Sequence, residues 1–292
     1  MKRIFLLVMT NVAIMLVLTV VVRITGLDQY LYAKYDVNYT GLLVVSAVFG
    51  FGGAFISLAI SKWMAKRAMG VRVIDKPGTA QEQWLLATVR SQAEQVGIAM
   101  PEVGIFNSPQ PNAFATGMRR DAALVAVSSG LLDRMQRNEV EAVLGHEIAH
   151  VANGDMVTLT LIQGVLNTFV FFLSRVIGDI VDKAVFRNER GRGMGYFVTV
   201  IAAQLVLGLL ASMIVMWFSR RREYRADQGG ARAAGTGNMI AALQRLKSST
   251  EQPLPAQMAA FGINGGRPSG LARLFRSHPP LDERIEALQQ SI

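Results

Sequence analysis

The sequence contains no cysteine and only three histidines among its 292 residues. Without cysteine, the chain has no thiol nucleophile, no disulfide framework and no thiolate ligand for a structural zinc ion. Charged residues are also scarce, at 17% of the chain, whereas 51% of the residues are hydrophobic. This balance is unusual for a soluble domain and is typical of a membrane protein.

Two long stretches without charge lie early in the chain, at residues 4–22 and 39–61. Nineteen residues of helix cover about 28 Å, close to the thickness of the hydrocarbon core of a bilayer. We therefore predict a two-span membrane anchor over residues 1–67. A cleaved signal peptide is the alternative for the first stretch, but no small-residue cleavage site follows it. Basic residues flank the pair on both sides, which favours a cytoplasmic location for both flanks.

Two further stretches without charge, residues 156–174 and 196–218, predict a hydrophobic helical hairpin over residues 156–218. The segment between them is basic, which argues against a simple hairpin whose turn lies outside the cell. Burial of the hairpin against the protein, or a shallow insertion into the membrane, is the alternative interpretation.

The remaining segments, residues 68–155 and 219–292, are polar enough to form the two parts of one cytosolic domain. Thr79 and Glu82 have the spacing of a capping box, which predicts a helix from this point to about Gly97.

Residues 102–106 and 122–127 are short β-prone runs bounded by turn residues, and they predict a small β-sheet. The expected fold class is therefore membrane α+β, with four hydrophobic helices and a cytosolic domain that combines helices with a small sheet.

His146, Glu147 and His150 form an H-E-x-x-H motif. Asn138 is a suitable N-cap with Glu141 three residues later, so the motif is expected on a helix. An apolar stripe with helical period supports this: Val140, Val143, Leu144, Ile148 and Val151. The two histidines then lie on one face and can share a zinc ion, with Glu147 beside the open position as the general base. An ordinary helix with surface histidines is the alternative.

A catalytic zinc ion needs a third protein ligand. His150 lies shortly before the hairpin and Glu223 shortly after it, so an antiparallel helical pair would bring the two together. Asp227 follows one helical turn later, where its carboxylate can accept the second ring N–H of a ligand histidine. A surface ion pair with Arg220 or Arg221 is the alternative role for Glu223.

These motifs resemble those of bacterial inner-membrane zinc metalloproteases of the gluzincin group, which are related to the eukaryotic CAAX prenyl-proteases. The resemblance covers almost the whole chain, including both hydrophobic pairs, the H-E-x-x-H motif, and residues 112–117, 223–227 and 277–282. It implies an endopeptidase with one Zn²⁺ per chain and an active site that faces the cytoplasm. Its substrates would be membrane proteins or unfolded polypeptides, often damaged ones, in protein quality control and the stress response.

Two further segments hold candidate residues. In similar proteases the segment Asn112, Ala113 and Phe114 corresponds to an edge strand beside the substrate. An extended substrate peptide would pair with this strand through backbone hydrogen bonds. A simple turn after Pro111 is the alternative. His278 precedes two prolines that suit a helix start, and it is a candidate donor to the oxyanion. A purely structural role is the alternative for His278.

The formal net charge of +9 raises the alternative of nucleic-acid binding. However, the basic residues gather at the ends of the hydrophobic stretches, where contact with the lipid bilayer explains them better. Two other functions stay open: a non-enzymatic, zinc-containing membrane adaptor and a CAAX-type processing peptidase. Glu147 argues against the adaptor, because a structural zinc site closes with four protein ligands and needs no base.

Overall fold

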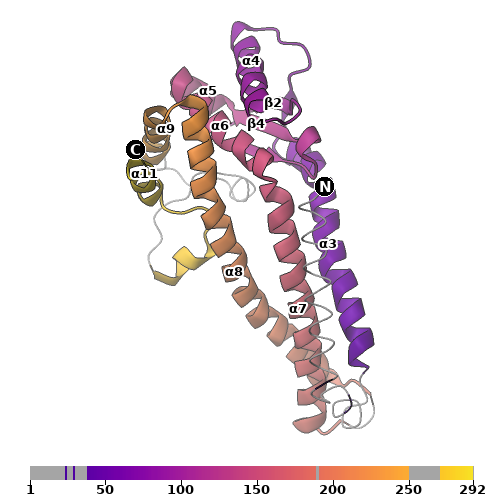
Figure 1. Cartoon of the computed structure of the whole chain (residues 1–292). Helices are drawn as coiled ribbons and strands as arrows, with labels where there is room; N and C mark the ends of the chain where they lie inside the picture. Colours follow the sequence, from indigo (N-terminus) through magenta and orange to yellow (C-terminus); the bar gives the residue numbers. More distant parts are fainter. Residues whose placement is uncertain (1–23, 25–28, 30–37, 189–190, 250–269, 292) are drawn as a thin grey trace. The chain divides into compact units, whose positions relative to one another are not determined.

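The computed structural model describes residues 24, 29, 38–188, 191–249 and 270–291 (Figure 1). The predicted first span at residues 4–22 lies outside these residues. The chain divides into two compact units, the first comprising Met1–Ser57 with Val157–Val215 and the second Leu58–Met156 with Met216–Ile292.

Three helices among the described residues are long and apolar enough to cross a membrane: α3 (Tyr39–Ala68), α7 (Asp155–Ala184) and α8 (Met194–Ala234). They contain the three predicted stretches at residues 39–61, 156–174 and 196–218, but they are longer. In particular, α7 continues to Ala184, so the first part of the basic segment between the two later stretches, residues 175–184, is helical.

Within the first unit, glycines allow the long helices to pack closely. A Cβ atom on Gly50 of α3 would lie 2.6 Å from the backbone nitrogen of Thr168 on α7. A Cβ atom on Gly178 would lie 2.4 Å from the Val200 side chain, where α7 meets α8. Close approach at small residues is how helices associate in lipid, where the hydrophobic effect gives no drive for association.

Buried carboxylates organise the turn between α7 and α8. Asp182 accepts hydrogen bonds from the backbone N–H groups of Gly193 and Tyr196, both at 3.0 Å, and so satisfies donors at the start of α8. Asp179 forms an ion pair with Arg192 at 3.1 Å. These contacts neutralise part of the basic charge that made a simple hairpin look unfavourable.

The second unit begins its helical layer with α4 (Ala80–Gln95), and the predicted capping box at its start is confirmed. The Thr79 hydroxyl accepts a hydrogen bond from the N–H of Glu82 at 3.1 Å, and the Glu82 carboxylate accepts from the N–H of Thr79. Glu82 also forms an ion pair with Arg72 at 2.7 Å, which ties α4 to the first strand of the sheet.

A small mixed sheet forms the other layer, with the order β1-β2-β4-β3. Its strands are β1 (Arg72–Val73), β2 (Glu102–Phe106), β3 (Ala113–Thr116) and β4 (Leu124–Ser128). β2 and β4 pair in parallel, whereas the two outer pairs are antiparallel. The predicted strand at 102–106 is confirmed; the run at 122–127 begins later, because Arg120–Ala122 forms the 3-10 helix η1.

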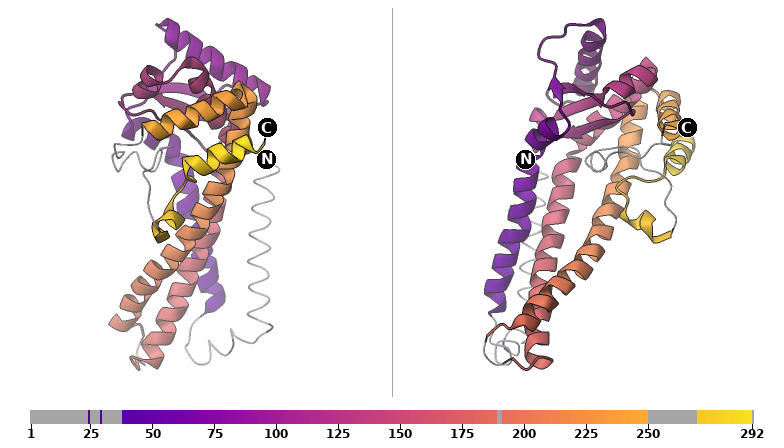
Figure 2. Two further views of the ribbon diagram at one scale, coloured as in Figure 1. Left: turned by 90° about the vertical axis from the view of Figure 1, so that its left-hand side faces the viewer. Right: turned by 180° about the vertical axis from the view of Figure 1, so that it is seen from behind.

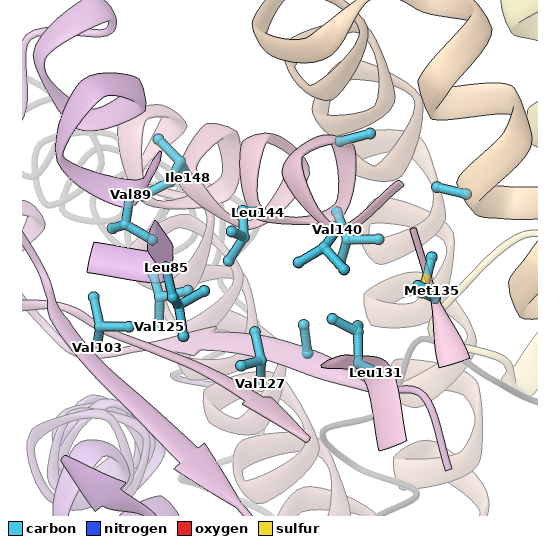
Figure 3. Packing of buried hydrophobic residues seen from close by; sticks show 14 of the residues in the cluster. Leu85, Val89, Val103, Val125, Val127, Leu131, Met135, Val140, Leu144 and Ile148 are labelled. Carbon is cyan, nitrogen blue, oxygen red and sulfur yellow. The ribbon is translucent and has the colours of Figure 1, made fainter. Parts of the chain in front are cut away.

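The main core lies between the sheet and α6 (Arg137–Asn153), as Figure 3 shows. Val140, Leu144 and Ile148 recur at helical spacing and face Val125 and Val127 of β4. The remaining elements are α5 (Ser129–Arg134), α9 (Thr236–Ser248), η2 (Gly270–Phe275) and α11 (Leu281–Gln289). α9 packs against both α6 and α11 (Figure 2).

The predicted start of α6 is wrong by two residues. Gln136, not Asn138, is the N-cap, and Glu139, not Glu141, occupies the third position. The Glu139 carboxylate accepts the Gln136 N–H at 2.8 Å. Asn138 instead donates to the side chain of Asn238 at 2.8 Å, so the residue chosen as a cap has a tertiary partner.

Candidate metal centre

Close contact between α6 and the C-terminal part of α8 brings the two halves of the predicted site together. A Cβ atom on Gly145 would lie 2.7 Å from Cβ of Ala233. A Cβ atom on Gly230 would lie 2.8 Å from the carbonyl oxygen of Ala142. Any larger residue at these positions would push the helices apart. The glycines therefore set the separation at which side chains of α8 reach those of α6.

His146, His150 and Glu223 direct donor atoms at one point. The two Nε2 atoms lie 3.1 Å apart. Oxygens of Glu223 lie 3.5 Å from Nε2 of His146 and 3.4 Å from Nε2 of His150. A tetrahedral zinc ion with bonds of about 2.0–2.1 Å holds its donors about 3.3–3.4 Å apart. These three side chains thus fit a zinc ion, and all three are buried.

The second ring nitrogen, Nδ1, of His146 and of His150 lies within hydrogen-bond distance of a carboxylate. Nδ1 of His146 lies 2.9 Å from Asp227, and Nδ1 of His150 lies 2.7 Å from Asp155. Such contacts place the proton on Nδ1 and turn Nε2 toward the metal position. Asp227 was chosen from the sequence, whereas Asp155 was missed. Gly154 ends α6 in the left-handed conformation, with a φ of 66°, and the turn brings Asp155 within hydrogen-bond distance of the His150 ring.

Arg284 of α11 is the most deeply buried charged residue that the sequence reasoning missed. Its side chain is fully buried and donates from Nε to Asp227 at 2.8 Å, with a second hydrogen bond from Nη2 to the same carboxylate. Its Nη1 lies 3.6 Å from Glu223. No local pattern marks this arginine in the sequence, because its partners lie far away in the chain.

Glu147 lies next to His146 on α6 and is also buried. Burial disfavours the charge of Arg284, but Asp227, Glu223 and Glu147 together outweigh that effect and raise the pKa of Arg284. Glu147 is therefore close enough to the centre to act on it through its charge.

The electrostatics of the bare cluster favour positive charge at its middle. Burial lowers the pKa of His150, but the Glu223 carboxylate and the hydrogen bond to Asp155 outweigh it and raise the pKa to about 9. A cation bound to Nε2 would take the place of that proton, so the same carboxylates that attract the proton favour a metal ion.

His278 contacts the centre directly, since its Nδ1 lies 2.7 Å from an oxygen of Glu223. The alternative partners of Glu223 are engaged elsewhere. Arg220 donates to backbone carbonyls in and just after η2, including that of Arg276 at 2.8 Å, and Arg221 lies over the ring of Trp217.

The segment Asn112, Ala113 and Phe114 runs into β3, which is the outer strand of the sheet and packs against α6. Asn112 is buried and accepts a hydrogen bond from the N–H of Ser128 at 2.8 Å. The edge-strand position that the resemblance implied is thus present, and it lies against the helix that carries both histidines.

These features are those of a membrane metallopeptidase. The sequence matches the description of peptidase family M48 over residues 79–292, and the chain belongs to that family. It is 64% identical over 289 residues to a "Protease HtpX homolog" of Thiobacillus denitrificans and 62% identical over 291 residues to "Protease HtpX" of Thioalkalivibrio sulfidiphilus. Each alignment covers 99% of both chains.

The fold is also similar to the crystal structure of S. mikatae Ste24p, with a TM-score of 0.60 at 18% sequence identity over 99% of this chain and 67% of that one. The resemblance drawn from the motifs is confirmed, and so is the enzyme class: the protein is a metallopeptidase, and its family and apolar helices are those of a membrane protein. The non-enzymatic adaptor is not supported.

Proposed function

We propose that the protein is a zinc-dependent endopeptidase of the bacterial inner membrane, which cleaves misfolded or damaged membrane proteins on the cytoplasmic side. The observation that carries this proposal is the convergence of His146, His150 and Glu223. The two Nε2 atoms lie 3.1 Å apart, and each lies 3.4–3.5 Å from a different oxygen of Glu223. Two imidazoles and one carboxylate are a donor set that suits zinc in peptidases and leaves one position open for chemistry.

The side chains of the centre have different proposed roles in the reaction. The chemistry that a bound zinc ion supplies is polarisation of the scissile carbonyl and acidification of water. Glu147 is the general base, which takes a proton from the attacking water and passes one to the leaving amine. Asp155 and Asp227 hold the two imidazoles in orientation.

His278 is the proposed donor to the oxyanion that forms during attack. Its Nδ1 donates to the Glu223 carboxylate, so Nε2 can donate to the oxyanion only when the ring carries both protons. We therefore propose a role for His278 in the reaction rather than as a zinc ligand.

The edge of β3 is the proposed substrate-binding strand. Asn112 lies opposite Ser128 and is hydrogen-bonded to it, and hydrogen-bonded pairs alternate along an antiparallel ladder. Phe114 and Thr116 therefore bond inward to β4, whereas the N–H and C=O groups of Ala115 point outward. An extended substrate segment can pair with these outward groups, and such pairing suits unfolded chains because it does not depend on their sequence.

The cytoplasmic side is supported by the distribution of basic residues. Lys62, Lys66 and Arg67 follow the apolar part of α3, and Arg220–Arg222 follow that of α8. Basic residues next to membrane spans are retained on the cytoplasmic side. Both groups belong to the same compact unit as the metal centre.

Substitution of Glu147 by glutamine tests the proposal, because it removes the base and keeps the shape of the side chain. We expect the variant to retain zinc while cleavage of an unfolded membrane-protein substrate falls by several orders of magnitude. Zinc content and proteolysis would be measured on the same detergent-purified samples. Glu141→Gln is the matched control on α6, since the side chain of Glu141 accepts a hydrogen bond from Trp84 of α4. Equal activity in wild type and Glu147→Gln would overturn the proposed mechanism.

A further inference from the structure

Two exposed tryptophans, on α3 and α8, belong to the second compact unit, the catalytic unit that holds the metal centre. Trp63 of α3 is 62% exposed and Trp217 of α8 is 49% exposed. In each case an arginine four residues later lies over the indole: Arg67 at 5.9 Å and Arg221 at 5.7 Å from the ring centroid. The same device, a tryptophan followed one turn later by an arginine, thus occurs on two separate helices of one unit.

The order along each helix is an apolar segment, then the tryptophan, then the arginine. Residues 39–61 of α3 and 196–218 of α8 hold no charge. Indoles favour the boundary between hydrocarbon and water, because the ring is apolar and its N–H is polar. Arginines just beyond that boundary reach the depth of lipid headgroups.

The two arginines differ from neighbouring cations in their partners. Lys62 and Lys66, on the same part of α3, both form ion pairs with Glu102. Within the described residues, by contrast, neither Arg67 nor Arg221 forms an ion pair with a carboxylate, and both are exposed. Their guanidinium groups are therefore oriented by an aromatic ring and left with hydrogen-bond donors for an external anion.

We propose that Arg67 and Arg221, each held over its tryptophan, bind the phosphate headgroups of anionic phospholipids and fix the catalytic unit at the membrane surface. The apolar segments beside them identify the partner as a lipid rather than a soluble phosphate. Glu223 lies six residues beyond Trp217 on the same helix, which is about 9 Å along the axis. In so far as the proposed peptidase function holds, the scissile bond would lie within about 10 Å of the headgroups.

Single-tryptophan variants in lipid nanodiscs test the position of the two pairs. The chain has three tryptophans, and the third, Trp84, belongs to α4. All variants would carry Glu147→Gln, so that the measurement does not depend on proteolysis. The outcome then tests the lipid proposal separately from the proposed peptidase function. We expect phospholipids brominated near the headgroup to quench Trp63 and Trp217 but not Trp84. Equal quenching of all three, or none, would overturn the proposal.

Charge variants then test headgroup binding. In nanodiscs of phosphatidylcholine with added phosphatidylglycerol, enrichment of phosphatidylglycerol around the protein would be measured with spin-labelled lipids. Arg67→Gln and Arg221→Gln should each lower that preference about fivefold, and Arg→Lys should largely restore it.

Arg137→Gln is the matched control for these variants, because Arg137 also lies over an indole, 5.3 Å from the ring of Trp84, but neither residue is on an apolar helix. It should leave the preference for phosphatidylglycerol unchanged. If all three Arg→Gln variants behave alike, or if quenching persists with no lipid preference in any of them, Arg67 and Arg221 are not headgroup sites.

Discussion

Arg284 balances an excess of negative charge around the candidate metal centre. Four carboxylates are buried there, from Glu147, Asp155, Glu223 and Asp227. Among the described residues, Arg284 is the only buried arginine, and it bonds Asp227 in the bidentate manner that a guanidinium allows. The residue that orients His146 is therefore itself held in place by a charge from another helix.

Replacing Arg284 by methionine should destabilise the catalytic unit by about 3–5 kcal/mol, because Asp227 would keep a buried charge without its partner. Denaturant unfolding of the metal-free protein measures the loss of stability, and the zinc content of the same variant measures its metal binding. Arg245→Met is the matched control, since Arg245 is partly exposed and lies 3.5 Å from Glu139. Its loss should cost less than about 1 kcal/mol. Similar losses in both variants would contradict the assigned role of Arg284.

Motif spacing was sufficient to select most of the residues that meet at the centre. His146, Glu147 and His150 are close together on one helix. Glu223 and Asp227 were predicted because an antiparallel helical pair would bring them back to the histidines. Asp155 and Arg284 could not be found in this way. Their roles depend on the turn at Gly154 and on the packing of α11, which no local pattern encodes.

The crossing of α6 and α8 is the element-level feature on which the site depends. Each helix would be stable with alanine in place of glycine, since alanine favours helix more strongly. The glycines at the crossing instead allow the two helices to lie close together, and this separation sets the distance from Glu223 to the histidines.

Gly230→Ala should lower zinc affinity strongly, because its Cβ atom would lie 2.8 Å from the Ala142 carbonyl oxygen and 2.7 Å from the Met239 sulfur. The matched control is Gly237→Ala in α9, where a Cβ atom would meet nothing within 4 Å. That variant should be neutral or stabilise by up to about 1 kcal/mol. Competition with a zinc chelator and thermal unfolding are the measurements. Unchanged zinc affinity in Gly230→Ala would show that the helix separation does not set the site.

The edge strand yields a second element-level prediction. Ala115→Pro removes an N–H that points away from β4, so the sheet keeps its ladder while a paired substrate loses one hydrogen bond. We expect kcat/KM for unfolded substrates to fall about tenfold, with little change in the melting temperature. Ala115→Val retains the N–H and controls for side-chain size. A fall of the same size in the valine variant would point to steric obstruction rather than to strand pairing.

Element boundaries show where sequence patterns become ambiguous. Gln136 with Glu139 and Asn138 with Glu141 both have capping-box spacing, and residue preference favoured the second pair. Tertiary contacts favour the pair Gln136 and Glu139 as the start of α6. Glu139 also lies near Arg245, while Glu141 is occupied by the indole N–H of Trp84.

At the scale of the whole molecule, hydrophobic stretches located the long helices but not their lengths. α7 continues into polar sequence, where Asp179 pairs with Arg192 and Asp182 satisfies donors at the start of α8. α8 likewise continues past its apolar part, to Ala234. The α+β character of the catalytic unit followed from short β-prone runs. The mixed order of its four strands did not, since strand order depends on contacts between distant residues.

The contact between Arg284 and the centre also has a consequence in time. Arg284 approaches His146 across 138 positions of the chain. Ribosomes add about 5–20 residues per second, so both histidines exist for roughly 7–28 s before the arginine is made. During that interval Asp227, once made, has no guanidinium partner to hold it against His146. The order of synthesis therefore leaves Asp227 without this partner until almost the whole chain has been made.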